Sequence, residues 1–306
     1  MSAGHPNRKG ITLTELLRLF PDDQAAEEFF ASVRWPDGVD CPKCGSTNVQ
    51  SGAKHKTMPF RCRACRGRFS VRTGTVMEAS NLGYQTWALA AYLLTTNLKG
   101  VSSLKLHRDL GVTAKTAWYL AHRLRKVWEA NLQFEGPVEA DETFIGGLAK
   151  NRHGRENRPK AIVVGMKDRS TKQVSAEVIE GTDRRTLHDF VQGHVEGDST
   201  VYTDEYPGYQ KLPLRHETVR HSAGEYVRDQ AHTNGIESFW SMLKRGYTGT
   251  YHWMSEKHLD RYVTEFSGRH NVRDLDTIEQ LHLVVLGMVG KRLRYAELTG
   301  LRGVDC

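Results

Sequence analysis

Three carboxylates in this sequence stand where their side chains could share divalent cations. Asp141 lies within the alternating apolar and polar run 138–145, which predicts a strand, and Asp204 follows a second such run. Glu237 lies in a pattern typical of a helix. Carboxylates are depleted in strands and costly to bury without a partner, whereas Mg²⁺ and Mn²⁺ prefer oxygen ligands. Each acid alone is more often a solvated side chain, but the trio predicts a site for two Mg²⁺ or Mn²⁺ ions that supports phosphoryl transfer on a polynucleotide.

Four cysteines form a second candidate site. Cys41, Cys44, Cys62 and Cys65 make two C-x2-C pairs at the separation typical of a zinc ribbon. Four thiolates match the closed tetrahedral site of structural Zn²⁺. A redox pair is the competing interpretation, but it requires one such pair within a βαβ pattern.

Cations surround these cysteines in the sequence. They are Lys54, Lys56, Arg61, Arg63, Arg66, Arg68 and Arg72. Basic clusters of this kind favour contact with DNA, although zinc ribbons also serve as protein-binding modules.

A helix-turn-helix pattern follows the ribbon. Residues 101–113 indicate a helix, a glycine turn and the cap of a second helix, whose apolar positions recur at core spacing from Ala117 to Trp128. The opposite face carries Lys115, Tyr119, His122 and Lys126. This arrangement predicts a DNA-recognition helix, with an ordinary helical hairpin and a solvated basic face as the alternative.

The order of the remaining elements predicts an α/β fold. Strand, strand, strand, helix, strand and then helices is the order of the RNase H-like mixed sheet flanked by helices. In that fold the first and fourth strands are central neighbours, so Asp141 and Asp204 are expected to face each other. On the last helix Asn234, Glu237, Ser241 and Lys244 share a stripe, so Lys244 could hold a phosphate near Glu237.

The totals agree with an anionic partner. The 306 residues carry a formal charge of +7 and a pI near 9.1. No apolar run approaches the roughly 20 residues that span a bilayer, and the N-terminus lacks a signal-peptide pattern. We therefore expect a cytoplasmic, nucleoid-associated protein with no membrane partner, and the odd number of cysteines argues against a disulfide framework.

These patterns divide the chain into five predicted segments. They are N-terminal helices (1–36), a zinc ribbon (37–79), a helix-turn-helix domain (80–132), the RNase H-like catalytic domain (133–275) and a C-terminal helical segment (276–306) that serves packing or oligomerisation.

Four motifs resemble a known family. CPKCG…RCRACRGRFSVRTGT, VEADETFIGG, VYTDEYPGY and HTNGIESFWSMLKRGYTGTYHWMSEKHLDRYVTEFSGRHN are similar to motifs of the zinc-ribbon DDE transposases of bacterial insertion sequences. The resemblance implies Asp141, Asp204 and Glu237 as the catalytic triad, with Lys244 as the basic partner on the same helix. Asn234 keeps a minor claim to metal contact, and Glu142 and Glu205 are expected on the opposite strand faces.

The expected function is metal-dependent cleavage of double-stranded DNA at the ends of an element, followed by transfer of the 3′-hydroxyls into target DNA. The resemblance also implies terminal inverted repeats as the cleaved sites and a homo-oligomer that holds two ends. Two alternatives stay open. One is an RNase H-like nuclease or resolvase without strand transfer, and the other is a domesticated zinc-ribbon and helix-turn-helix regulator.

Overall fold

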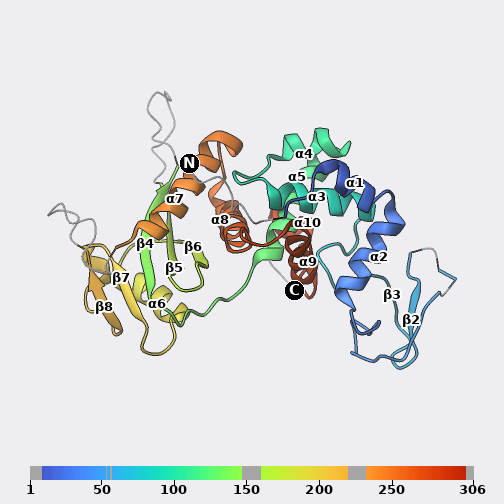
Figure 1. Ribbon diagram of the computed structural model, residues 1–306, viewed down its shortest axis with the longest axis horizontal. Coiled ribbons are helices and arrows are strands. Elements are labelled where there is room, and N and C mark those ends of the chain that lie inside the picture. Colours follow the sequence, from blue (N-terminus) through green and yellow to red (C-terminus); the bar gives the residue numbers. More distant parts are fainter. Residues whose placement is uncertain (1–8, 53, 56, 147–159, 220–231, 301–306) are drawn as a thin grey trace. The chain divides into compact units, whose positions relative to one another are not determined.

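The computed structural model describes residues 9–52, 54–55, 57–146, 160–219 and 232–300. Lys56, one of the cations around the ribbon cysteines, lies outside this part of the chain. The chain forms two compact units (Figure 1). The first comprises Met1–Trp128 and Asp274–Cys306, and the second comprises Glu129–Arg273.

The first unit is built mainly of helices around one core. Its first three helices are α1 (Leu13–Leu19), α2 (Asp23–Arg34) and α3 (Tyr84–Thr96). Asp22 separates α1 from α2 because its side chain accepts the N–H of Ala25 and caps the second helix. Phe20, Phe30 and Trp87 are almost wholly buried in the shared core.

Two shorter helices follow α3 and are joined by a tight turn. Helices α4 (Ser103–Leu110) and α5 (Ala114–Arg125) are capped by Ser102 and Thr113, whose hydroxyls each accept a backbone N–H. Gly111 ends α4 with a φ of 63°, a left-handed conformation that favours glycine. The 3₁₀ turn η1 (Lys126–Trp128) continues from α5.

The C-terminal segment packs within this first unit. Helix α9 (Thr277–Met288) lies against α2, α3 and η1, and a Cβ at Gly287 would lie 2.7 Å from the carbonyl oxygen of Val127. The apolar spacing from Ile278 to Leu293 predicts one helix over that range, but α9 ends at Met288 because Val289 turns extended and pairs with Thr75. A short helix, α10 (Tyr295–Thr299), follows.

The predicted ribbon is a three-stranded antiparallel sheet. Its strands are β1 (Val49–Gln50), β2 (Phe60–Cys62) and β3 (Arg68–Phe69). The rings of Phe60 and Phe69 stack at a centroid distance of 5.5 Å, and Trp35 meets both edge-on. The ribbon therefore has a small aromatic core in addition to its cysteines.

The second unit contains the predicted mixed sheet. Its strands are β4 (Val138–Ile145), β5 (Ala161–Asp168), β6 (Val174–Ile179), β7 (Thr200–Thr203) and β8 (Arg215–Thr218), in the spatial order β6-β5-β4-β7-β8. β5 is antiparallel to both of its neighbours, whereas β4, β7 and β8 are parallel. The RNase H-like α/β fold is thus confirmed, with the first and fourth strands adjacent as expected. The short polar edge strand β8 was not predicted.

Helices cover both faces of this sheet (Figure 1). Helix α6 (Arg184–His194) packs on one face, and α7 (Asn234–Gly246) and α8 (Glu256–Asn271) pack on the other. Short helical turns η2 (Pro207–Tyr209) and η4 (Tyr247–Tyr251) follow β7 and α7. Asn271 fixes α8 to the sheet edge because its amide bonds both the N–H and the C=O of Val174. Within the described residues, every helix is too short or too polar to cross a bilayer.

Candidate functional site

Strand β4 presents carboxylates on both faces of the sheet. Glu139 and Asp141 point to the face covered by α7, since Asp141 Oδ2 accepts a hydrogen bond of 2.9 Å from Trp240 Nε1. Glu142 points to the opposite face and accepts a hydrogen bond of 2.9 Å from the hydroxyl of Tyr209. Asp141 and Glu142 therefore lie on opposite faces, as the strand alternation predicts.

Asp204 lies near Asp141, at the end of the neighbouring strand. In the parallel pair β4–β7, Val138 is opposite Val201 and Glu139 is opposite Tyr202. Asp204 directly follows the last residue of β7, on the strand next to the one that carries Asp141. Burial, together with the nearby carboxylates of Glu142 and Asp204, raises the pKa of Asp141 to about 7. Asp204 is thus close enough for its charge to oppose the ionisation of Asp141.

Glu139 connects β4 to the start of α7. Its side chain is 2% exposed, and its Oε2 accepts the N–H of Ile236 at 2.9 Å, in the first turn of the helix. Arg169 Nε donates to Oε1 at 2.9 Å, and His232 Nδ1 lies 3.2 Å from the same oxygen. A Cβ at Gly235 would come within 2.6 Å of this carboxylate, so the close approach requires glycine there. The sequence analysis missed this residue, although its spacing of two from Asp141 places both on one strand face.

Glu237 and Lys244 lie on the exposed side of α7, as the helical stripe predicts. Glu237 Oε1 accepts a hydrogen bond of 2.8 Å from the hydroxyl of Thr233. In the described part of the chain, the four ribbon cysteines are the only group of three or more potential ligands gathered closely enough to hold an ion. The convergence of Glu237 with Asp141 and Asp204 therefore stays a prediction.

The donors around Asp141 fit a hard divalent cation in their chemistry. They are carboxylate oxygens, and burial together with the charges of Glu142 and Asp204 raises the pKa of Asp141. A cation beside Asp141 and Asp204 would turn their mutual repulsion into binding energy.

The ribbon cysteines are gathered as a tetrahedral metal requires. Their four sulfur atoms lie within 4.8 Å of one another, with 3.6 Å between Cys41 and Cys65 and 3.7 Å between Cys44 and Cys62. Zn–S bonds of about 2.3 Å at tetrahedral angles imply sulfur separations of about 3.8 Å. The four residues therefore fit Zn²⁺ in number, type and spacing.

The predicted DNA-binding face of α5 requires correction. His122 is fully buried, with its ring edge-on to Trp118 at 4.7 Å, so it cannot contact DNA from this position. Tyr119 is half-buried and its hydroxyl donates to the carbonyl of Leu293, while Lys126 lies in the half-buried turn η1. The C-terminal segment covers this side of the helix. Of the four predicted residues, only Lys115, in the first turn, is exposed.

Most of the described cations around the ribbon are exposed. These are Lys54, Arg61, Arg63, Arg66 and Arg68. Arg72 is the exception, because its guanidinium lies 4.1 Å from the centroid of the Tyr84 ring and donates to the carbonyl of Ser80 at 2.6 Å. Arg72 therefore joins the ribbon to α3, since Tyr84 lies in that helix.

Comparison with known proteins agrees with the fold and the cysteine cluster. Residues 133–271 match the ISXO2-like transposase domain, and residues 21–68 match the transposase zinc-ribbon domain. The chain belongs to the family of zinc-ribbon DDE transposases of insertion sequences. Within that family, its second unit carries the ISXO2-like form of the domain.

Two relatives are also connected with transposition by their descriptions. A protein in the transposable element ISH50 of Halobacterium salinarum is 26% identical over 280 residues, which cover 84% of this chain and 93% of that protein. A transposase-like protein of Haemophilus influenzae is 28% identical over 102 residues, covering 32% of this chain and 81% of that protein.

One solved structure has a distant similarity. It is the simian T-cell lymphotropic virus intasome in complex with the PP2A regulatory subunit B56 gamma, with 17% identity and a TM-score of 0.29 over 60% of this chain and 65% of that chain. A similarity of this size supports no argument about function.

Replacing Glu139 by Gln is expected to destabilise the second unit. The change keeps the side-chain size but removes the charge that faces Arg169 and His232, and breaking a buried ion pair costs about 3–5 kcal/mol. Urea unfolding measures the loss. The matched control is Glu217→Gln on the exposed edge strand β8, which should change stability by less than about 0.5 kcal/mol. Equal effects of the two variants would contradict the role of Glu139.

Replacing Asp141 by Asn is expected to stabilise the metal-free protein more at pH 8 than at pH 4. The folded pKa of about 7 exceeds the unfolded value near 4, so the native state retains a proton that the unfolded chain releases within this window. Wild-type stability therefore falls as pH rises from 4 to 7, and Asn removes this dependence. Denaturation at several pH values in EDTA should show the difference between variant and wild type growing by on the order of 1 kcal/mol per pH unit. A difference in stability between variant and wild type that stays constant with pH would disprove the raised pKa of Asp141.

Replacing Cys62 by Ser is expected to remove the metal of the ribbon. Wild type should contain about one Zn²⁺ per chain, because four thiolates make one closed site, and the variant almost none. Elemental analysis measures the content, and circular dichroism should show that the sheet of the second unit persists. Cys306→Ser is the control and should retain zinc. A Cys62→Ser protein with full zinc content would refute the site.

Proposed function

We propose that this protein is a DNA transposase that cuts at the ends of an element and joins the freed 3′-hydroxyls to target DNA. The observation that supports this most directly is the position of Asp141 in β4 and of Asp204 directly after the adjacent parallel strand β7, within a matched transposase domain. The raised pKa of Asp141 agrees with a site that takes up positive charge.

In the proposed site, Asp141, Asp204 and Glu237 hold two Mg²⁺ or Mn²⁺ ions. When bound, such ions activate a water or a 3′-hydroxyl and stabilise the leaving oxygen. The other residues act by positioning. Trp240 donates to Asp141 and fixes one carboxylate oxygen, while Glu139 fixes the first turn of the helix that bears Glu237. Lys244, exposed on the same helix, binds a phosphate of the DNA.

The first unit supplies DNA binding in this proposal. The exposed arginines of the ribbon neutralise phosphates, and the N-terminal turn of α5, which carries Lys115, enters a groove. Because two ends of an element must be held together for joining, we also propose that the active form is a homo-oligomer.

A strand-transfer assay on DNA that contains the element ends tests the proposal. With Mg²⁺ or Mn²⁺, wild type should yield joined product, and Asp141→Asn, Asp204→Asn or Glu237→Gln should each lower the yield by roughly a hundredfold or more, the scale at which a misplaced catalytic group is felt. Asp198→Asn is the control, since this carboxylate is 92% exposed in the same unit. If wild type gives hydrolysed ends but never joined product, the protein is a nuclease instead. If the triad variants match wild type, the assigned residues are wrong.

A further inference from the structure

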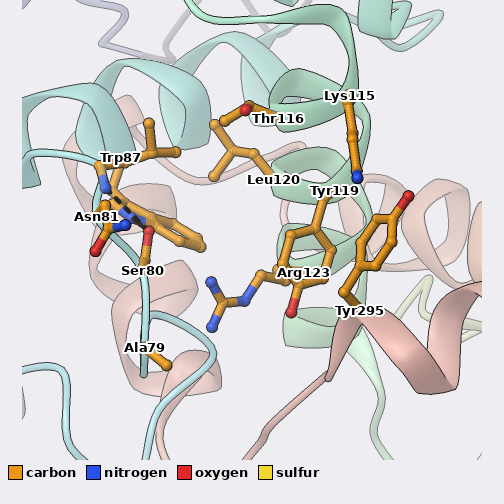
Figure 2. A pocket seen from close by; sticks show the side chains of 11 residues that line it. Ala79, Ser80, Asn81, Trp87, Lys115, Thr116, Tyr119, Leu120, Arg123 and Tyr295 are labelled. Carbon is orange, nitrogen blue, oxygen red and sulfur yellow. Dashed lines mark hydrogen bonds between the residues drawn. The ribbon is translucent and has the colours of Figure 1, made fainter.

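The aromatic cavity of the first unit is filled by the protein's own cations. Figure 2 shows the guanidinium of Arg123 between Trp87 and Tyr119. Its central carbon lies 5.5 Å from the centroid of the Trp87 ring and 5.0 Å from that of the Tyr119 ring. Lys115 Nζ lies 4.6 Å from the centroid of the Tyr295 ring. These cation–π contacts use the ring faces for packing, so the cavity offers no open aromatic face to a ligand.

In the second unit, a hydrogen-bond relay leads from the edge strand to Asp204. Thr203, the last residue of β7, is wholly buried, and its hydroxyl donates to the carbonyl oxygen of Asp204 at 2.8 Å. His216 Nε2, on β8, lies 2.8 Å from the same hydroxyl oxygen. A hydroxyl has one proton, and Thr203 uses it in the bond to Asp204, so His216 Nε2 is the donor to Thr203. The relay therefore runs from His216 through Thr203 to the backbone of Asp204.

The position of Asp204 requires a restraint of this kind. Asp204 lies just beyond β7, whose pairing with β8 ends at Thr203. The charge of Asp204 opposes the ionisation of both Asp141 and Glu142, so repulsion favours movement of Asp204 away from β4. The relay resists that movement, because it ties the Asp204 backbone to the neighbouring strand through His216.

We infer that His216 is a positioning residue that holds Asp204 in place for a divalent cation. The relay fixes the carbonyl of Asp204, and Asp204 Oδ1 accepts the N–H of Tyr206 at 3.0 Å. The first bond restrains the backbone and the second orients the carboxylate relative to that backbone. The inference rests on the proposed function, because it takes Asp204 as a metal ligand. It adds an outer residue that orients this ligand, a role on which metal affinity commonly depends.

Amide exchange of the full-length protein tests the relay without metal or DNA. The N–H of Tyr206 is the reporter, because its bond to Asp204 Oδ1 lasts only while Asp204 keeps its place. In His216→Phe, which keeps a ring but loses the donor, this amide should exchange about fivefold faster than in wild type, the effect of losing one hydrogen bond. Thr203→Val should show the same increase. Wild-type exchange at Tyr206 in both variants would overturn the inference.

Two further variants separate the relay from a general loosening of the sheet edge. His216→Gln retains an N–H donor and should restore most of the protection of the Tyr206 amide. Thr218→Val is the matched control for Thr203→Val, since these threonines are opposite each other on β7 and β8 and Thr218 is exposed. It should leave the exchange unchanged. If Thr218→Val raised the exchange as much as Thr203→Val, the relay would be refuted.

The proton on the His216 ring gives a spectroscopic test. Burial and the neighbouring His188 lower the pKa of His216, so the ring is neutral near neutral pH. The relay requires that its proton be on Nε2. Two-bond ¹H–¹⁵N correlation spectra distinguish the two tautomers, and the signals absent from His216→Gln identify this ring. A proton on Nδ1 would overturn the relay.

Mn²⁺ titration of the zinc-loaded protein, followed by the electron paramagnetic resonance signal of free Mn²⁺, tests the role in metal binding. His216→Phe and Thr203→Val should each weaken Mn²⁺ binding by about 10- to 100-fold, the usual effect of losing a residue that orients a ligand. His216→Gln should bind within a few-fold of wild type, and Thr218→Val should match it. Faster exchange at Tyr206 with unchanged Mn²⁺ affinity would make His216 a structural residue only and refute the positioning role.

These measurements distinguish failure of the relay from failure of the proposed function. If wild type binds no Mn²⁺ although His216→Phe and Thr203→Val raise the exchange at Tyr206, the relay exists but the metal assignment of Asp204 is wrong. If wild type binds Mn²⁺ and neither variant changes exchange or affinity, the metal site stands and His216 has no part in it.

Discussion

The geometry of the candidate catalytic unit depends on one buried carboxylate. Glu139 would be costly to bury alone, but the N–H of Ile236, the guanidinium of Arg169 and the positive end of the α7 dipole compensate its charge. Two residues further along the same strand face, Asp141 accepts a hydrogen bond from Trp240. These two bonds reach different turns of α7, so they set both its position along β4 and its rotation.

Much of this unit could be predicted from local patterns. The alternating runs and the order of strands and helix determine which strands neighbour each other, because a helical crossover joins parallel strands. The adjacency of β4 and β7 was predicted by matching that order to the RNase H-like fold. The strand β8 was missed because Arg215–Thr218 is a short polar segment with no apolar alternation. The role of Glu139 was missed because sequence does not distinguish a glutamate that caps a distant helix from one in solvent.

The predicted recognition face of α5 shows the limit of helical periodicity. Spacing correctly predicts that Lys115, Tyr119 and His122 follow one another along the helix, but it does not show what covers them. Tyr119 is covered by the C-terminal part of the chain. The carbonyl oxygen of Leu293 accepts a hydrogen bond from the hydroxyl of Tyr119, and the ring of Tyr295 packs against the ring of Tyr119. Among the four predicted contact residues, the exposed Lys115 in the first turn of α5 is the one that stays available for the predicted DNA contact.

The arrangement around β4 explains why a rigid scaffold is needed for these acids. Burial and the repulsion from the neighbouring carboxylates of Glu142 and Asp204 raise the pKa of Asp141 to about 7, so without a cation the fold loses stability as the pH rises toward that value. A flexible segment would relieve that repulsion by moving apart. The hydrogen bonds between β4 and β7 prevent such a movement within the sheet. The bonds from Ile236 to Glu139 and from Trp240 to Asp141 hold β4 to α7 as well. Binding of a cation would remove the repulsion between the carboxylates and so stabilise the fold. The repulsion that destabilises the metal-free fold therefore increases its affinity for the ion.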